Sequence, residues 1–319
     1  MEKIKAFLRR KDIIFSAKRY FIDAMGAMAQ GLFCTLLVGT ILNTIGQQFH
    51  IGFLNAVIVT LGKGDGAVSY TIGGLCSAMV GPGMAVAIAG ALKAPPLVLF
   101  SLIPVGFAAN YMGGAGGPLA VLFVALFAAE VGKAVSKETK IDILVTPIVT
   151  VLAGIGLAAL IAAPVGTAAS AVGQAIMWAT ELQPFFMGII VSVVIGVALT
   201  LPISSAAICA ALGLTGLAGG AAVAGCCAQM VGFAVMSFRE NRWGGLAAQG
   251  IGTSMLQMGN IVRNPRIWIP PTLASAITGT DWLGLVLISF VLPAVLTWLI
   301  AIPLRKWGWI KDGDLKLDL

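Results

Sequence analysis

Long apolar runs, separated by short polar or glycine- and proline-rich breaks, dominate the chain. A transmembrane helix takes roughly 20 apolar residues, so this pattern leaves room for about eight to ten such helices. The pattern therefore predicts an all-α polytopic membrane protein. The apolar runs lie at residues 21–45, 51–61, 67–92, 95–111, 119–131, 143–165, 184–201 and 283–302.

Three regions differ from simple membrane-spanning helices. Gly81-Pro82-Gly83 lies in the middle of the run 67–92, where proline and glycine kink a helix or divide it in two. Residues 202–238 are mostly Ala, Gly, Cys and Met, which is typical of helices packed inside protein, and we predict a re-entrant hairpin there. A short connecting helix is expected at 173–180. Proline-broken apolar segments occur in both halves of the chain, as in transporters built from inverted repeats, so an inverted repeat remains an open interpretation.

Composition supports the membrane assignment and locates the charge. Hydrophobic residues make up 59% of the chain and charged residues 10%, and the mean hydropathy is +0.98, which excludes an ordinary soluble domain. The net charge is +7, and the basic residues gather before the first apolar run and after the last one. The positive-inside rule therefore predicts that both termini are cytoplasmic. Because the basic residues do not form one folded face, no nucleic-acid partner is expected.

The N-terminal segment 1–20 is basic and amphipathic. Ile4, Phe7, Leu8 and Ile14 fall roughly on one helical face among the cations, so the segment is expected to lie along an anionic inner leaflet of the lipid bilayer. The five cysteines lack metal-ligand spacing. We predict neither a metal site nor a cofactor.

The polar, proline-broken segment 259–272 is the strongest candidate site. At bilayer depth, non-helical backbone and charge are tolerated only inside protein or beside a wet cavity. Amide and guanidinium groups offer oriented donors to hydroxyl, carboxylate or phosphate groups. We therefore predict substrate-binding roles for Asn260, Arg263, Asn264 and Arg266. The alternative is that the arginines lie at the interface or cap helix carbonyls, and that Pro265 simply begins a helix.

Four further polar residues are substrate-binding candidates. Gln249 and Gln257 are two helical turns apart and share a face, where ligand contact and interhelical hydrogen bonding are equally good interpretations. Ser204 and Ser205 follow Pro202, and their hydroxyls either contact a substrate or satisfy a helix end. No catalytic residue is predicted. Trp268 is expected to be an interfacial anchor.

Two segments resemble the membrane-embedded IIC subunits of the bacterial phosphotransferase sugar permeases. Residues 140–150, KIDILVTPIVT, followed by Ala163-Pro164-Val165-Gly166, look like the fifth-helix region of those subunits. Residues 259–273, GNIVRNPRIWIPPTL, are similar to the region of their Asn-Glu-Pro motif. The chain departs from the family in two ways: Asn264 stands where the motif has Glu, and the single histidine, His50, lies far upstream of the position of the family's sugar-contacting His. Within the family, the chain resembles a divergent stand-alone branch that includes proteins described as toxin-gene regulators.

The resemblance implies a homodimer in the bacterial inner membrane, with an IIC-like elevator architecture and re-entrant hairpins. The domains it implies are a cytoplasmic N-terminus at 1–20, a scaffold and dimerisation region at 21–135, a linker span and connecting helix at 136–182, a transport region at 183–304, and a cytoplasmic tail at 305–319.

Together these features predict a transporter of a small polar solute, sugar-like or sugar-acid-like, that catalyses no covalent chemistry by itself. The missing acidic side chain and the two arginines favour an anionic substrate modestly over a neutral sugar. Two alternatives stay open. One is a membrane sensor or regulator that keeps the permease fold, and the other is a phosphotransferase permease that works with separate IIA and IIB phosphocarrier proteins.

Overall fold

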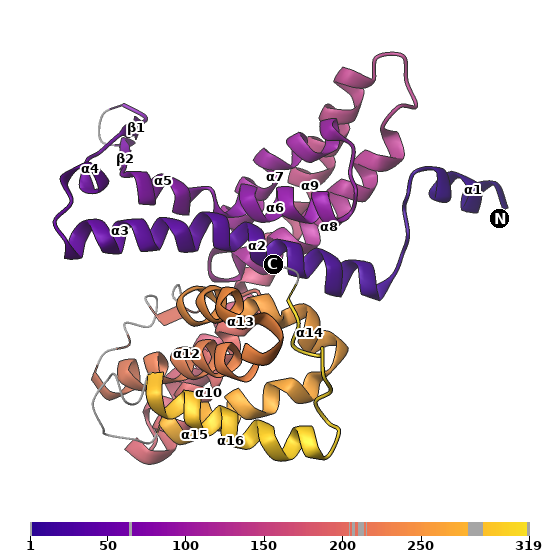
Figure 1. Ribbon diagram of the computed structural model, residues 1–319. Helices are drawn as coiled ribbons and strands as arrows, with labels where there is room; N and C mark the ends of the chain where they lie inside the picture. Colours follow the sequence, from indigo (N-terminus) through magenta and orange to yellow (C-terminus); the bar gives the residue numbers. More distant parts are fainter. Residues whose placement is uncertain are drawn as a thin grey trace. The chain divides into compact units, whose positions relative to one another are not determined.

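The computed structural model describes residues 2–63, 66–203, 205, 208–209, 214, 216–279 and 290–317. This part of the chain is almost entirely helical (Figure 1), which confirms the prediction of an all-α polytopic membrane protein. The chain divides into two compact units, which are described separately. Unit 1 comprises Met1–Tyr20, Ala27–Met112 and Ala120–Ile161, and unit 2 comprises Phe21–Gly26, Gly113–Leu119 and Ala162–Leu319.

The N-terminal third begins with helix α1 (Glu2–Arg10), followed by one long helical stretch, Arg19–Gln48. The long stretch corresponds to the predicted run 21–45. It contains two π-helical segments and consists of η1 (Arg19–Asp23), α2 (Ala24–Leu32), η2 (Phe33–Leu37) and α3 (Val38–Gln48).

The weaker apolar run 51–61 is not a membrane-spanning helix. It forms the short helix α4 (Gly52–Asn55) and strand β1 (Val59–Leu61), which pairs antiparallel with β2 (Val68–Tyr70). Valine and threonine favour strands, and Gly62, with φ +90°, takes the left-handed backbone needed at the turn.

The predicted break in the run 67–92 is present. Helices α5 (Ile72–Ala78) and α6 (Val80–Ala91) meet at Met79 with a bend of 53°. Gly81 and Pro82 belong to the first turn of α6, where a proline without an N–H is tolerated. The sequence therefore located this break to within two residues.

The next helical stretch, Pro96–Val135, is a hairpin of α7 (Pro96–Gly113) and α8 (Gly117–Val135) joined by η4 (Gly114–Gly116). The two helices run antiparallel, because a Cβ at Gly132 near the end of α8 would lie 2.7 Å from Val98 near the start of α7. Gly114, with φ +52°, lies at the reversal. Helix α9 (Asp142–Thr180) packs on this hairpin, since a Cβ at Gly154 would contact both Val105 and Ala128.

Helix α9 is continuous over 39 residues, roughly 58 Å. The sequence predicts an apolar span at 143–165 and a separate connecting helix at 173–180. The structure instead carries the helix through Pro164 and merges both segments.

Besides η4 and the ends of longer helices, unit 2 contains nine helical elements within the described residues. Helices α12, α15 and α16 lie side by side in it (Figure 1). The elements are α10 (Pro184–Thr200), α12 (Gly216–Met236), α13 (Phe238–Ala247), η5 (Ala248–Gly252), η6 (Ser254–Gln257), α14 (Met258–Arg263), η7 (Pro265–Trp268), α15 (Ile269–Thr278) and α16 (Leu292–Lys306).

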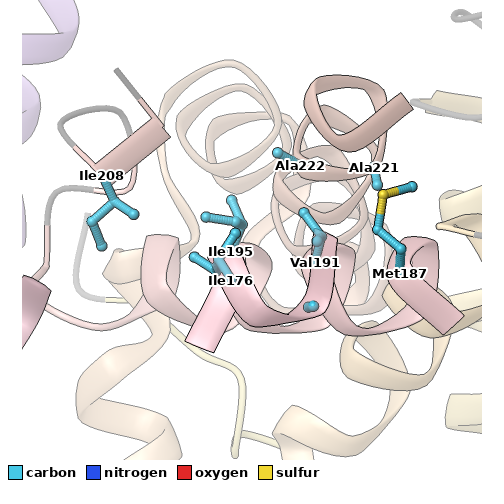
Figure 2. Packing of buried hydrophobic residues seen from close by; sticks show 8 residues of the cluster. Ile176, Met187, Val191, Ile195, Ile208, Ala221 and Ala222 are labelled. Atoms are coloured by element: carbon cyan, nitrogen blue, oxygen red, sulfur yellow. The ribbon is translucent and has the colours of Figure 1, made fainter. Parts of the chain in front are cut away.

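Small residues allow the helices of unit 2 to approach closely. A Cβ at Gly225 of α12 would overlap the carbonyl oxygen of Ser192 of α10, and one at Gly279 would overlap that of Gly188. Such backbone contact is typical of helix packing in membranes. Apolar side chains of α9, α10 and α12 form a core cluster around Ile176, Val191 and Ile195 (Figure 2).

Among the described residues, four helical stretches are long and apolar enough to cross a membrane, or five if the bent pair α5–α6 is one span. This is fewer than the predicted number of about eight to ten. The run 51–61 forms α4 and strand β1 instead, α10 has only 17 residues, and the start of the last run lies outside the described residues. The division into scaffold and transport regions stays a prediction.

Candidate functional site

Two interruptions of helical structure meet in unit 2. Helix α10 ends at Thr200 and is followed by extended Leu201 (φ −73°, ψ 158°). The second interruption is Thr253 (φ −156°, ψ 143°), which separates η5 from η6. The hydroxyl oxygens of Thr200 and Ser254, both buried, are 2.7 Å apart. Two breaks that are distant in sequence are therefore joined by a pair of hydroxyls.

Gln229 of α12 lies at the centre of this meeting point and is fully buried. Its side-chain oxygen accepts hydrogen bonds from the indole N–H of Trp268 (3.1 Å) and the hydroxyl of Thr200 (3.4 Å). Its Nε2 donates to the hydroxyls of Thr272 (3.3 Å) and Ser275 (3.4 Å). We call these residues together with Ser254 the Gln229 cluster. Three of the four contacts are long for hydrogen bonds, so these groups are held loosely.

A cavity of about 490 Å³ lies beside this cluster along α12. Cys226 lines it and precedes Gln229 by three residues, which is about one helical turn. Ser205, one of the predicted site residues, also lines the cavity, together with Cys209 and Cys227. The volume is in the range of small-molecule sites. Ser204, the neighbouring candidate, lies outside the described residues.

The structure brings three predicted site residues together in a second place. Gln249 donates to the hydroxyl of Ser237 (2.9 Å), Gln257 donates to Gln249 (3.0 Å), and Asn260 donates to Gln257 (2.8 Å). We call Gln249, Gln257 and Asn260 the amide row. All three are buried. The interhelical hydrogen bonding considered for the two glutamines is therefore present.

The chain's own C-terminal segment covers the amide row. The backbone carbonyl of Leu315 accepts from Gln257 (3.0 Å) and from Asn241 (2.7 Å), and the carbonyl of Lys316 accepts from Asn260 (2.8 Å). Leu315 itself is fully buried. Residues 307–317, called the tail below, thus accept hydrogen bonds from two amides of the row.

The remaining candidates flank the amide row. Asn264 caps η7 by accepting from the N–H of Arg266 (3.2 Å), with Pro265 at the first helical position, and it also donates to Asp314 of the tail (2.7 Å). Arg263 and Arg266 are exposed, and the guanidinium of Arg266 stacks on Trp309 at 5.1 Å. This agrees with the alternative in which Pro265 begins a helix. His50 lies in unit 1, exposed just after α3.

Sequence reasoning missed Gln229 and Thr200. Gln229 lies in the stretch that appeared only as small residues, yet a single amide in an apolar helix is itself a signal, because polar side chains inside a membrane need partners. Trp268, expected to be an interfacial anchor, instead donates to Gln229. The sequence pattern does not show this hydrogen bond, because Trp268 and Gln229 are 39 positions apart.

The fold and these sites define a polytopic helical membrane protein with buried polar groups at the meeting of discontinuous helices, an arrangement that membrane transporters use. The chain belongs to the EIIC family of the phosphotransferase system, whose family model matches residues 22–281. This confirms the resemblance to the IIC permeases and makes the chain, in general terms, a membrane sugar permease. No curated protein and no solved structure matches the chain.

Proposed function

We propose that this protein carries a small polar solute, a sugar or a sugar acid, across the bacterial inner membrane, and that the solute binds at the Gln229 cluster. Thr200, Gln229 and Ser254 would bind its hydroxyls, and the cavity beside Ser205 would admit it. The chain itself catalyses no covalent step.

One observation carries this proposal: two helix breaks meet at a buried amide whose hydrogen bonds are mostly long. A solute hydroxyl exchanges readily with such contacts, because little bonding is lost when they open. The location also agrees with transporters whose sites lie at interrupted helices.

The experiment is uptake of radiolabelled hexoses and hexuronic acids into proteoliposomes. Thr200→Val keeps the shape of the side chain and removes its hydroxyl, and we expect it to lower uptake about tenfold, the equivalent of one good hydrogen bond. Thr150→Val is the matched control, because Thr150 is equally buried and its hydroxyl donates to the carbonyl of Thr146 in its own helix. Equal uptake by the two variants would remove the Gln229 cluster from the proposal.

The finer features of the mechanism are part of the same proposal. We propose an elevator movement of the region 183–304 against a scaffold at 21–135 in a homodimer, with both termini in the cytoplasm. The acidic and imidazole side chains of the family's sugar site have no counterpart here, and amides and hydroxyls replace them. Cross-linking of single-cysteine variants in each region, in membranes, tests the movement.

Phosphorylation of the solute depends on separate partners in this proposal. Family membership supports cooperation with phosphocarrier proteins. If such partners act here, labelled sugar should appear inside the vesicles as a phosphate ester only when the purified phosphocarriers are added.

A second candidate function is a membrane sensor that keeps the permease fold. The covered amide row favours it, because a tail bonded through Leu315 and Lys316 is a segment whose release would signal occupancy. Hydrogen exchange of residues 307–317 and solute uptake into proteoliposomes together distinguish the two functions. In a sensor, added solute would lower the exchange protection of the tail without net uptake. In a transporter, net uptake of solute would be observed.

A further inference from the structure

Three separate parts of unit 1 line one basic cavity. The cavity measures about 370 Å³ and is formed by the end of α1 and the residues after it, by the connection between α6 and α7, and by the end of α8 with the loop that follows. Two carboxylates, of Asp12 and Glu138, face five cations. The surplus of three positive charges makes this a candidate site for an anion. The cations are Arg10, Lys11, Lys93, Lys133 and Lys137.

Some of these charged groups already pair with other groups of the protein. The buried Lys133 donates to the backbone carbonyls of Asp12 (2.7 Å) and Leu92 (3.1 Å) and pairs with Glu130 (3.1 Å). Glu138 pairs with Arg10 (2.6 Å) and Lys11 (2.5 Å). The hydrogen bond from Lys11 lowers the pKa of Glu138, and the one from Arg19 lowers the pKa of Asp12. Both carboxylates are therefore ionised at neutral pH, so the count of charges holds.

Lys93 and Lys137 are different from the other cations. Each follows the end of a helix, α6 or α8, in the left-handed region of the backbone, with φ 55° and 61°. Glycine is the usual residue at such positions, because a side chain there costs about 1 kcal/mol. Within the described part of the chain, no hydrogen bond or ion pair engages either ammonium group. The helix-end carbonyl of Leu92 already accepts from Lys133 and Arg19, so Lys93 is not needed to satisfy it.

We propose that this cavity binds the phosphate group of an anionic phospholipid. Its residues precede the apolar stretches Arg19–Gln48 and Pro96–Val135 or lie at the end of the second, and the ends of such stretches are where headgroups lie. Ile14 and Phe15, which follow the cavity residue Asp12, are 51% and 73% exposed and offer contact to acyl chains. An inorganic phosphate would contact the same cations, but it has no acyl chains to pack against these apolar side chains.

The test measures binding of dioleoyl-phosphatidylglycerol and of dioleoyl-phosphatidylcholine to the full chain in detergent, by native mass spectrometry. The test variant is Lys93→Gly with Lys137→Gly, because glycine suits both left-handed positions and folding is preserved or improved. The matched control is Lys5→Ala with Lys140→Ala, which removes two exposed lysines that do not line the cavity. We expect the test variant to bind phosphatidylglycerol about 30-fold more weakly, since each lysine near anionic lipid contributes about a factor of five.

The control pair and the phosphatidylcholine affinity should change little. Equal phosphatidylglycerol affinity in the test and control pairs would overturn the site. In a further arm, inorganic phosphate is added at millimolar concentration to the phosphatidylglycerol complex. Retention of the lipid supports the proposal, and its displacement at that concentration would identify free phosphate as the ligand and overturn the lipid assignment. None of these readouts involves solute transport, so they are independent of the proposed function.

Discussion

At the scale of single residues, Arg242 has a backbone conformation that an arginine adopts only under strain. Its φ is 51° and its ψ is −147°, inside the segment Phe238–Ala247. This part of conformational space is close to the region that essentially only glycine occupies, and a side chain there costs about 1–3 kcal/mol. The preceding residue, Asn241, holds the tail through Leu315 and Leu317. The kink at Arg242 therefore occurs where α13 meets the tail.

We predict that Arg242→Gly raises the stability of the folded protein by about 1 kcal/mol, because glycine adopts this conformation without strain. The measurement is the midpoint of thermal unfolding in detergent, followed by circular dichroism. Arg239→Gly is the control, since Arg239 lies on the same helix with only an exposed ion pair to Asp312. In that helical position glycine should cost about 1 kcal/mol. Similar losses in both variants would show that Arg242 is not strained.

At the scale of elements, the contact between α10 and α12 depends on the absence of a side chain. A Cβ at Gly225 would overlap the carbonyl oxygen of Ser192, and one at Gly196 would lie 2.7 Å from the carbonyl oxygen of Gly225. Backbone atoms cannot move aside as a flexible side chain does. The helices must separate if either glycine is replaced, and Gln229 lies one turn beyond Gly225 on the same helix.

We predict that Gly225→Ala destabilises unit 2 by about 1–3 kcal/mol, the usual cost of overpacking. Gly220→Ala on the same helix is the control, because no atom lies within 4 Å of a Cβ placed there. Alanine should stabilise that position by about 0.5–1 kcal/mol, since glycine weakens a helix. Thermal unfolding of the two variants, measured in one detergent, should therefore shift in opposite directions. Shifts in the same direction would contradict the close approach of α10 and α12.

The elements were largely predictable where local chemistry decides them. The first apolar run and the break before Gly81-Pro82-Gly83 are local properties, and both are present. Hydrophobicity alone could not separate a span from the short helix α4 and strand β1 at 51–61, because strands and helices both accept apolar residues. Nor could it show that α9 continues through Pro164, since neighbouring helices decide whether a proline ends a helix.

At the scale of the whole chain, the candidate site was predictable only in part. The segment that carries Asn260 and Gln257 was recognisable as polar backbone in an apolar sequence. Its partners were not, because Leu315 and Lys316 follow 58 and 56 residues later in a short, unremarkable tail. The Gln229 cluster likewise gathers residues from five elements, and no single segment shows its polarity. Pairing between distant segments is therefore the information that the sequence pattern lacked.

The tail and the amide row satisfy each other's buried hydrogen-bonding groups. Removing residues 307–319 leaves the buried amides of Gln257 and Asn260 without their tail acceptors, and each unsatisfied group costs about 1–3 kcal/mol. We expect the truncated chain to unfold at a lower temperature. Gln257→Met, which keeps the volume and removes the amide, should cost about 1 kcal/mol or more in the full chain.

The same substitution should cost much less in the truncated chain, because the amide has already lost its tail acceptor there. The cycle of the two changes should show a coupling of about 0.5–3 kcal/mol, as for residues in one hydrogen-bond network. Thr150→Val, which alters a buried hydroxyl in unit 1 that donates within its own helix, should show no coupling to the truncation. Additive effects of Gln257→Met and the truncation would mean that the tail does not close the amide row. Coupling would mean that the hydrogen bonds of Leu315 and Lys316 to the amide row contribute to the stability of the folded chain.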